Sequence, residues 1–330
     1  MMESSAGVAE RGQTVGGVER TGRRRRASRR VPPAPRRLDF ADLLSNVRDH
    51  IALTKPRIIS LLLWTTVTTM FVAQPSGLAL STILWTCLGG YLAAGGAGAI
   101  NHYIDRDIDA RMGRTRGRPI VSGRVEPLRA LLFGISLGVI ATIQLWITVN
   151  ALAAVLALLG LLGYVLLYTA WLKPRTPQNI VIGGAAGAMP PLVGWAAATG
   201  GLSIEAFFPF LVVFLWTPPH FWALALLISD DYKRTGIPMM PVARGDAFTR
   251  RSILLYAALL VVFTLVPVAT GMFGSVYLAA ASVLGAAFIF GATRLLRSRT
   301  NRDALRLYLG SLAYLFLLFA AMAADRLLAG

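Results

Sequence analysis

Nine long apolar segments follow one another along this 330-residue chain, separated by shorter polar connections. They cover residues 58–74, 79–100, 128–149, 151–171, 180–199, 205–228, 252–273, 275–293 and 304–326. The stretch from Ala130 to Leu172 contains no charged residue at all. About 20 apolar residues, each rising about 1.5 Å along a helix, cross a hydrocarbon core of about 30 Å. The pattern therefore predicts an all-α, polytopic membrane bundle of about nine transmembrane helices.

The positive charges are distributed in one consistent way between these segments. If the N-terminus is placed inside and the chain crosses nine times, every Lys and Arg except Arg326 falls on the inner side. Because inner loops of membrane proteins are enriched in these residues, the count and the orientation support each other. We expect a bacterial plasma (inner) membrane protein whose N-terminus and active-site loops are cytoplasmic, with the mitochondrial inner membrane as the alternative. The net charge of +17 then orients the protein, and no nucleic-acid partner is predicted.

The first 48 residues differ from the rest of the chain in composition. They are rich in Arg, Gly, Ser and Pro, contain the run Arg23 to Arg26, and have no apolar period. This composition predicts a disordered, arginine-rich cytoplasmic tail over residues 1–48, followed by a transmembrane domain over residues 49–330. The single cysteine, Cys87, excludes an intramolecular disulfide and a cysteine-based metal site.

A stripe of oxygen-bearing side chains follows the second apolar segment. If the helix continues past Ile100, then Asn101, Asp105 and Asp109 recur every four residues and share one face. Carboxylates four residues apart repel each other, and the negative end of the helix dipole disfavours them further. Both effects indicate a bound cation. Two carboxylates and an amide suit Mg²⁺, which commonly bridges to substrate phosphates.

Arginines follow this stripe directly, at positions 111, 114, 116 and 118. Guanidinium groups match the geometry of phosphate oxygens. Acids for a metal, arginines for an anion and a membrane boundary together favour a diphosphate carried on a lipid as the ligand. The alternative is a solvated juxtamembrane loop whose charges only pair with one another.

Four motifs carry a resemblance to a known family. Asn101, Asp105 and Asp109 resemble the first aspartate-rich motif of the UbiA superfamily of intramembrane prenyltransferases. Within it, N-x3-D-x3-D-x2-M-x-R-T-x2-R-P from Asn101 to Pro119 resembles the protoheme IX farnesyltransferases, or haem O synthases. So do LTKPRI from Leu53, LKPRTPQN from Leu172 and TPPHFWALA from Thr217. The resemblance covers roughly residues 50 to 325 and leaves out the tail.

The resemblance implies nine helices around a central cavity open to the lipid. It implies transfer of a farnesyl group from farnesyl diphosphate to a vinyl group of haem b, with water addition, giving haem O and diphosphate. The implied catalytic residues are Asn101, Asp105, Asp109 and His220, and the implied diphosphate ligands are Arg114, Arg118, Lys173, Asn179 and Lys233. The implied cofactor is Mg²⁺, held by Asn101, Asp105 and Asp109 with Asp230 and Asp231. A haem-A-forming enzyme or oxidase assembly factors are open as protein partners.

The second acidic motif departs from the superfamily pattern. The superfamily places two aspartates four residues apart after the sixth segment, whereas this chain has adjacent Asp230 and Asp231. The haem-modifying branch shares this reduced form. The alternative for these acids and for Lys233 is a charged helix end outside the membrane core.

His220 lies about ten residues, or about 15 Å, before this motif and therefore inside the membrane. An ionisable residue at that depth indicates function, and neutral imidazole is a common ligand of haem iron. The alternative is a histidine that donates to a backbone carbonyl freed by Pro218 and Pro219.

Two other functions compete with haem farnesylation. One is a UbiA-type prenyltransferase that acts on a quinone precursor or chlorophyllide, which TPPHF and the reduced second motif disfavour. The other is a secondary transporter, which also has many glycine-rich spans and polar groups at the midplane. A transporter predicts charges within the bilayer, and the apolar segments here are nearly uncharged.

Overall fold

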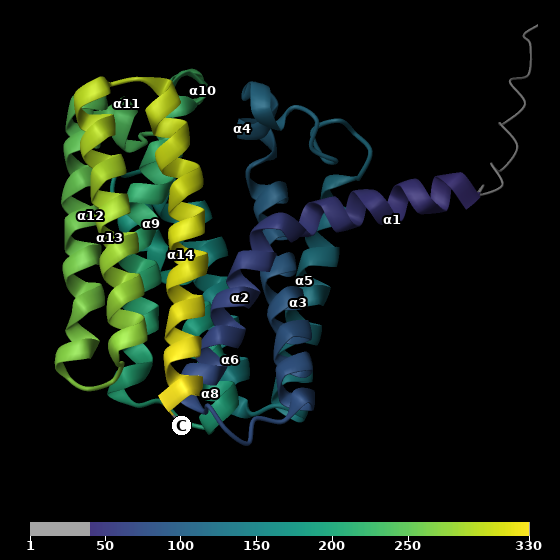
Figure 1. Cartoon of the computed structure of the whole chain (residues 1–330). Helices are drawn as coiled ribbons and strands as arrows, with labels where there is room; N and C mark the ends of the chain where they lie inside the picture. The colour runs from purple at the N-terminus through teal and green to yellow at the C-terminus, as the bar shows by residue number, and fades with distance from the viewer. Residues whose placement is uncertain (1–39, 330) are drawn as a thin grey trace, which may run out of the picture. The chain divides into compact units, whose positions relative to one another are not determined.

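The computed structural model describes residues 40–329, and all of the regular structure there is helical (Figure 1). The main helices are α1 (Phe40–Thr54), α2 (Pro56–Ala73), α3 (Leu80–Ile104), α4 (Arg106–Arg111), α5 (Pro127–Thr148), α6 (Ala151–Leu162), α7 (Asn179–Gly187), α8 (Met189–Thr199), α9 (Phe207–Leu227), α10 (Ser229–Thr235), α11 (Met240–Arg244), α12 (Asp246–Ala269), α13 (Ser275–Ser298) and α14 (Asn301–Ala329). Three shorter elements are the 3₁₀ turns η1 (Gly113–Thr115) and η3 (Ile204–Ala206) and the π-helix η2 (Gly163–Leu172). Most of the predicted tail lies outside the described residues, but residues 40–48 form the beginning of α1 and are not a disordered segment.

The described residues contain nine helical segments that are long and apolar enough to span a membrane. They match the nine predicted segments in order, with α6 continuing into η2 and α7 into α8. The boundary that differs most from the prediction is the start of the seventh segment, which was predicted at residue 252. The helix begins at Asp246 because a polar first turn precedes its apolar residues. The predicted all-α, nine-span architecture is therefore confirmed.

Small residues allow the helices to approach one another closely. A Cβ atom added to Gly96 in α3 would lie 2.7 Å from the carbonyl oxygen of Gly134 in α5, and the reverse contact would be 2.9 Å. In α8, a Cβ atom on Gly194 would lie 2.2 Å from the carbonyl oxygen of Thr66 in α2. Such contacts between small residues are how helices associate in lipid, where the hydrophobic effect between them is weak. The glycines thus set the spacing of the helices around the interior.

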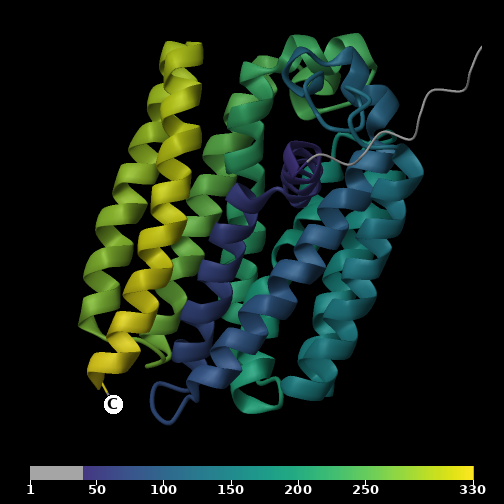
Figure 2. The same cartoon turned by 90° about the vertical axis from the view of Figure 1, so that its right-hand side faces the viewer.

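The two acidic segments lie at the same end of the bundle, as the crossing pattern predicts. Helices α4 and α10 are both at the top of Figure 1, and the C-terminal end of α14 is at the bottom. Helix α1 runs across the bundle and not along it in Figure 1, and Figure 2 shows the same helix nearly end-on. The backbone N–H of Gly113 lies 3.4 Å from Asp231 Oδ1, which joins the two acidic segments directly.

We expect Gly194→Ala to lower the stability of the bundle by about 1–3 kcal/mol, because the added methyl group meets rigid backbone. Gly187→Ala is the matched control, since a Cβ atom there has no neighbour within 4 Å. Thermal unfolding of the two variants in the same detergent measures the difference. Equal midpoints for both variants would contradict the close α2–α8 approach.

Candidate active site

The predicted stripe begins near the end of α3 and continues into α4. Asp105 lies at the junction, and its backbone N–H donates to the Asn101 carbonyl oxygen at 2.9 Å. The Asp109 N–H donates in turn to the Asp105 carbonyl oxygen at 2.8 Å, so the helical spacing persists across the junction. The three residues are buried, each only 3 % exposed. The carboxylates are thus held inside the protein, where a charge needs a partner.

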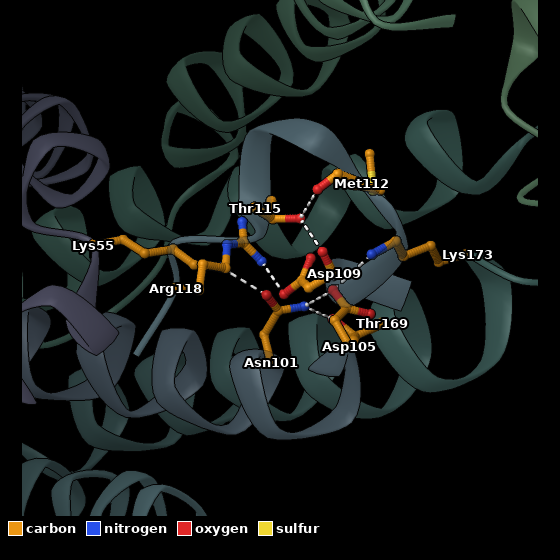
Figure 3. Close-up of polar contacts among 9 residues, drawn as sticks. All are labelled: Lys55, Asn101, Asp105, Asp109, Met112, Thr115, Arg118, Thr169 and Lys173. Atoms are coloured by element: carbon orange, nitrogen blue, oxygen red, sulfur yellow. Dashed lines mark hydrogen bonds and ion pairs between the residues drawn. The ribbon is translucent and has the colours of Figure 1, made fainter. Parts of the chain in front are cut away.

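A network of polar contacts supplies these partners (Figure 3). Asn101 Nδ2 donates to Asp105 Oδ2 at 2.8 Å, and Lys173 Nζ donates to the same oxygen at 2.6 Å. Arg118 is bound to Asp109 through its guanidinium group. Thr115 closes the turn after α4 by donating to the Asp109 carbonyl oxygen at 2.7 Å. The network therefore joins the stripe to the following loop and to the residues after η2.

Lys55 is a member of this network that the sequence did not identify. Its Nζ donates to Asn101 Oδ1 at 2.6 Å, and its backbone has φ 60° and ψ 55°, in the left-handed region. That conformation is uncommon for a side chain other than glycine, and it turns the chain sharply from α1 into α2. Burial, together with the positive charge of Arg118, lowers the pKa of Lys55 to about 7. The sequence offered only one indication of this role, the position of Lys55 in the LTKPRI motif. A lysine on the inner side of the membrane is also what the positive-inside rule predicts, so the motif did not single it out.

The π-helix η2 brings Lys173 and Thr169 to the stripe. Its wider turn appears in the bond from the Lys173 N–H to the Tyr168 carbonyl oxygen, five residues back. Thr169 Oγ1 donates to the Tyr164 carbonyl oxygen and accepts from Asn101 Nδ2 at 3.1 Å. Short π-helical segments are frequent at functional sites. Thr169 was missed because one threonine in an apolar run has no distinguishing pattern.

The donor set fits a hard divalent cation. Asp105 Oδ1 is buried and has no hydrogen-bond partner, which leaves a negatively charged oxygen available as a ligand. Burial raises the pKa of Asp109, and the neighbouring Asp105 charge adds to this, while Arg118 opposes it. A cation beside these oxygens would favour their charged forms. Oxygen ligands from carboxylates and an amide are those that Mg²⁺ prefers.

The second acidic segment lies farther out. Asp230 is 86 % exposed and contacts Lys233 Nζ at 3.2 Å. Asp231 is bound to Arg234 and lies near the Gly113 N–H. Among residues 40–329, no three His, Cys, Asp or Glu side chains gather closely enough to hold one ion. Asp230 and Asp231 therefore do not form a single carboxylate cluster with Asp105 and Asp109.

The remaining predicted diphosphate ligands differ in their surroundings. Arg114 is exposed in the middle of η1, and its backbone lies within hydrogen-bonding reach of Asp231. Asn179 is fully buried at the start of α7, where its Nδ2 donates to the Thr176 carbonyl oxygen at 2.7 Å. Asn179 Oδ1 is buried without a partner. The structure thus places Arg118 and Lys173 in the network, whereas Arg114 and Lys233 are exposed nearby or beyond it.

An apolar cavity begins at this network and extends into the bundle. Lys55 and Tyr164 line it at one end, and Thr66 and Val193 line it deeper between α2 and α8. Its other walls are mostly small or aliphatic residues of α2, α3, α6, α7 and α8. The 11 residues from Lys55 to Thr66 correspond to about 16 Å along the α2 helix. A charged mouth above a long apolar interior suits an amphiphile with an anionic head.

His220 lies apart from the stripe, in α9. Its Nδ1 is 2.7 Å from Ser311 Oγ in α14, and its ring stacks between Trp216 and Tyr308. Ser311 Oγ also lies 2.6 Å from the Tyr308 carbonyl oxygen, and a hydroxyl that donates to this carbonyl accepts from Nδ1–H. In the tautomer with the proton on Nδ1, the Nε2 atom can accept a proton or bind a metal. The Nδ1 contact is thus made to a side chain of α14 and not to a carbonyl that Pro218 or Pro219 frees in α9.

Comparisons with known proteins agree with this architecture. A profile described as the UbiA prenyltransferase family matches residues 62–320. A protoheme IX farnesyltransferase of Roseiflexus sp. is 53% identical over 283 residues, which are 86% of this chain and 53% of that protein. One from Symbiobacterium thermophilum is 53% identical over 281 residues, which are 84% of this chain and 94% of that protein. The chain spans about half the length of the first curated relatives it matches.

The fold is also found among solved structures. A UbiA homologue from Archaeoglobus fulgidus, bound to DMAPP and Mg²⁺, superposes with a TM-score of 0.64 at 19% identity. The match covers 83% of this chain and 99% of the homologue. Because the profile covers most of the nine spans and the fold agrees, this chain belongs to the UbiA prenyltransferase family.

Proposed function

We propose that this chain transfers a farnesyl group from farnesyl diphosphate to a vinyl group of haem b and so makes haem O. The observation that carries the proposal is the apolar cavity whose mouth is formed by Lys55, within a buried network of carboxylates and cations. The acceptor is inferred from the similarity to protoheme IX farnesyltransferases along most of the chain. That similarity covers 94% of the relative from Symbiobacterium thermophilum.

The cationic side chains provide a binding site for the diphosphate group. Lys55, Lys173 and Arg118 approach the stripe from three different segments of the chain. Arg114 is exposed at the outer edge of this network, and Asn179 has a buried side-chain oxygen, Oδ1, without a hydrogen-bond partner. Held in a buried site, such donors stabilise negative charge that grows on the leaving group. They would therefore favour cleavage of the bond between the farnesyl C1 carbon and the diphosphate oxygen.

The apolar cavity has a separate part in the reaction. When the bond breaks, the electron pair leaves with the diphosphate and the farnesyl group becomes an allylic cation. The aliphatic walls would keep water away from this cation until the haem vinyl group attacks it. Water then adds to the former vinyl group and releases a proton, which gives a hydroxyethylfarnesyl side chain.

Mg²⁺ is the cofactor we infer, with Asp105, Asp109 and Asn101 as the residues that would hold it. The unpartnered Asp105 Oδ1 and the Mg²⁺ bound to the Archaeoglobus homologue support this assignment. When bound, Mg²⁺ would neutralise charge on the diphosphate. Asp231 borders the same region through Gly113, whereas the exposed Asp230 and Lys233 would need to turn inward to contribute.

His220 is our candidate for contact with the porphyrin. Its half-buried ring is oriented by Trp216, Tyr308 and Ser311, and a proton on Nδ1, shared with Ser311, would leave Nε2 unprotonated. An unprotonated imidazole nitrogen held in this way can bind haem iron or accept the proton released on water addition. We further propose that the end of the bundle with α4 and α10 faces the bacterial cytoplasm, on the grounds of the positive-inside pattern.

The main test is mass spectrometry of porphyrins after incubation of purified protein with haem b, farnesyl diphosphate and Mg²⁺. We expect a haem that has gained one farnesyl group and one water, and no product with EDTA. Asp105→Asn/Asp109→Asn should lower the rate by roughly 10²-fold or more, because two ligands of the proposed metal lose their charge. Asp107→Asn is the matched control, since Asp107 is 82 % exposed on the same short helix and should retain activity.

Two outcomes of that experiment would change the assignment. Prenylation of a quinone precursor or chlorophyllide, with no haem product, would keep the family and refute haem as the acceptor. Equal loss of activity in Asp107→Asn and in the double variant would refute a special role for the stripe.

A bulky side chain in the cavity should weaken binding of the prenyl chain and leave binding of the diphosphate head group unchanged. We expect Ala94→Phe to raise the KM for farnesyl diphosphate at least tenfold, because Ala94 lines the cavity. Dimethylallyl diphosphate, with its shorter chain, should compete for the site nearly as well as in the parent protein. Ala279→Phe on the exposed face of α13 is the control. If Ala94→Phe weakened the binding of both diphosphates equally, the farnesyl chain would have to lie outside this cavity.

Loss of the histidine should separate haem binding from diphosphate binding. We expect His220→Ala to lower haem affinity at least tenfold in an absorbance titration, while farnesyl diphosphate affinity stays within twofold. Ser311→Ala should have a smaller effect, because it removes only the hydrogen-bond partner of Nδ1. Unchanged haem affinity in His220→Ala would exclude the histidine as a haem contact.

A further inference from the structure

A groove on the α13–α14 pair is separate from the site described above. Its volume is about 430 Å³, and its residues all come from these two helices. At the end near the connecting loop it is lined by Arg294, Asp303 and Arg306. The remainder is apolar, with Leu284, Phe288, Gly291, Gly310, Ala313 and Leu317 among its walls. None of these residues belongs to the network of Figure 3.

The charged end of the groove has more positive than negative charge. Arg294 Nε and Arg306 Nη1 both bind one oxygen of Asp303, Oδ1, at 3.0 and 3.1 Å. The Asp303 side chain is only 7 % exposed, whereas the two arginines are about half exposed. One carboxylate therefore orients two guanidinium groups and neutralises only one of them. The other nitrogen atoms of both groups remain available at the groove.

The surrounding segment strengthens this imbalance. Between residues 294 and 306 the chain has five arginines and a single acid, Asp303. Arg297 and Arg302 add their charge from exposed positions outside the groove lining. A site with this charge at a membrane boundary attracts anionic head groups, and guanidinium forks match phosphate oxygens.

The apolar part has the length of one lipid leaflet. The stretch from Arg294 back to Leu284 and the stretch from Arg306 on to Leu317 each correspond to about 15 Å along a helix. Half of a hydrocarbon core is also about 15 Å. At Gly310 an added Cβ atom would meet nothing within 4 Å, so this glycine leaves open space along the groove. An acyl chain can therefore lie along the two helices below the arginines.

We propose that this groove binds one anionic phospholipid, with the phosphate between Arg294 and Arg306 and an acyl chain along Gly310. Paired guanidinium groups above an apolar groove favour such a lipid over other occupants. A second protein helix would not need the paired guanidinium groups, and a free phosphate would not use the apolar walls. The inference does not depend on which acceptor the enzyme prenylates.

The experiment is native mass spectrometry of the full chain released from nanodiscs of phosphatidylglycerol, phosphatidylcholine or their mixture. We expect one retained phosphatidylglycerol, preferred at least tenfold over phosphatidylcholine. Arg294→Gln/Arg306→Gln should lower this retention at least tenfold. Arg297→Gln/Arg302→Gln removes the same charge outside the groove lining and should retain the lipid.

A second variant tests the groove without altering its charges. Gly310→Leu fills the open space and should also lower retention at least tenfold, whereas Gly310→Ala should change it less than twofold. Circular dichroism of each variant establishes that the bundle is folded. Equal retention of both lipids, equal effects of the two arginine pairs, or full retention in folded Gly310→Leu would each overturn the proposal. Displacement of the lipid by equimolar farnesyl diphosphate would overturn it in favour of a second substrate site.

Discussion

Two buried carboxylates, Asp105 and Asp109, impose the constraint on which the rest of the site depends. Removing one partner from a buried ion pair commonly costs about 3–5 kcal/mol, because the remaining charge has no compensation. Lys173 pairs directly with Asp105 and Arg118 with Asp109, while Lys55 is linked to Asp105 through Asn101. These cations come from the α1–α2 junction, the end of η2 and the loop after α4. Electrostatics therefore ties together parts of the bundle that are distant in sequence and defines the mouth of the cavity.

The same constraint accounts for the irregular backbone around the site. Lys55 reaches Asn101 from a left-handed residue between two helices, and Thr169 and Lys173 reach the stripe from a π-helix. Both conformations are less favourable than a continuous α-helix, by about 1–3 kcal/mol for the left-handed residue. They persist where surrounding contacts determine them, and here those contacts are bonds to the acidic stripe. The π-helix and the left-handed Lys55 therefore lie at the site itself, whereas Arg299, the other left-handed non-glycine residue among residues 40–329, lies in the turn between α13 and α14.

The sequence allowed the membrane spans and the acidic stripe to be predicted, but not the residues that reach the stripe from other segments. The nine spans and the shared side of the two acidic segments depend on apolar length and charge distribution, which are local properties of the sequence. The stripe was also local, since its residues recur every four positions on one helix. Lys55 and Thr169 could not be found in that way, because their role depends on contacts with residues 46 and 68 positions away. Asp230 and Lys233 are the opposite case. Their motif suggested that they bind metal and diphosphate, but their side chains are mainly exposed.

Charge balance also explains why a metal and a diphosphate would bind together. Two carboxylates face Lys173, Arg118 and a Lys55 whose pKa is about 7, so the network is close to neutral before any ligand binds. A diphosphate alone would add several negative charges beside buried carboxylates and would be repelled by them. A divalent cation alone would be repelled by the lysines and the arginine. Binding of both offsets these effects, and therefore each ligand should increase the affinity for the other.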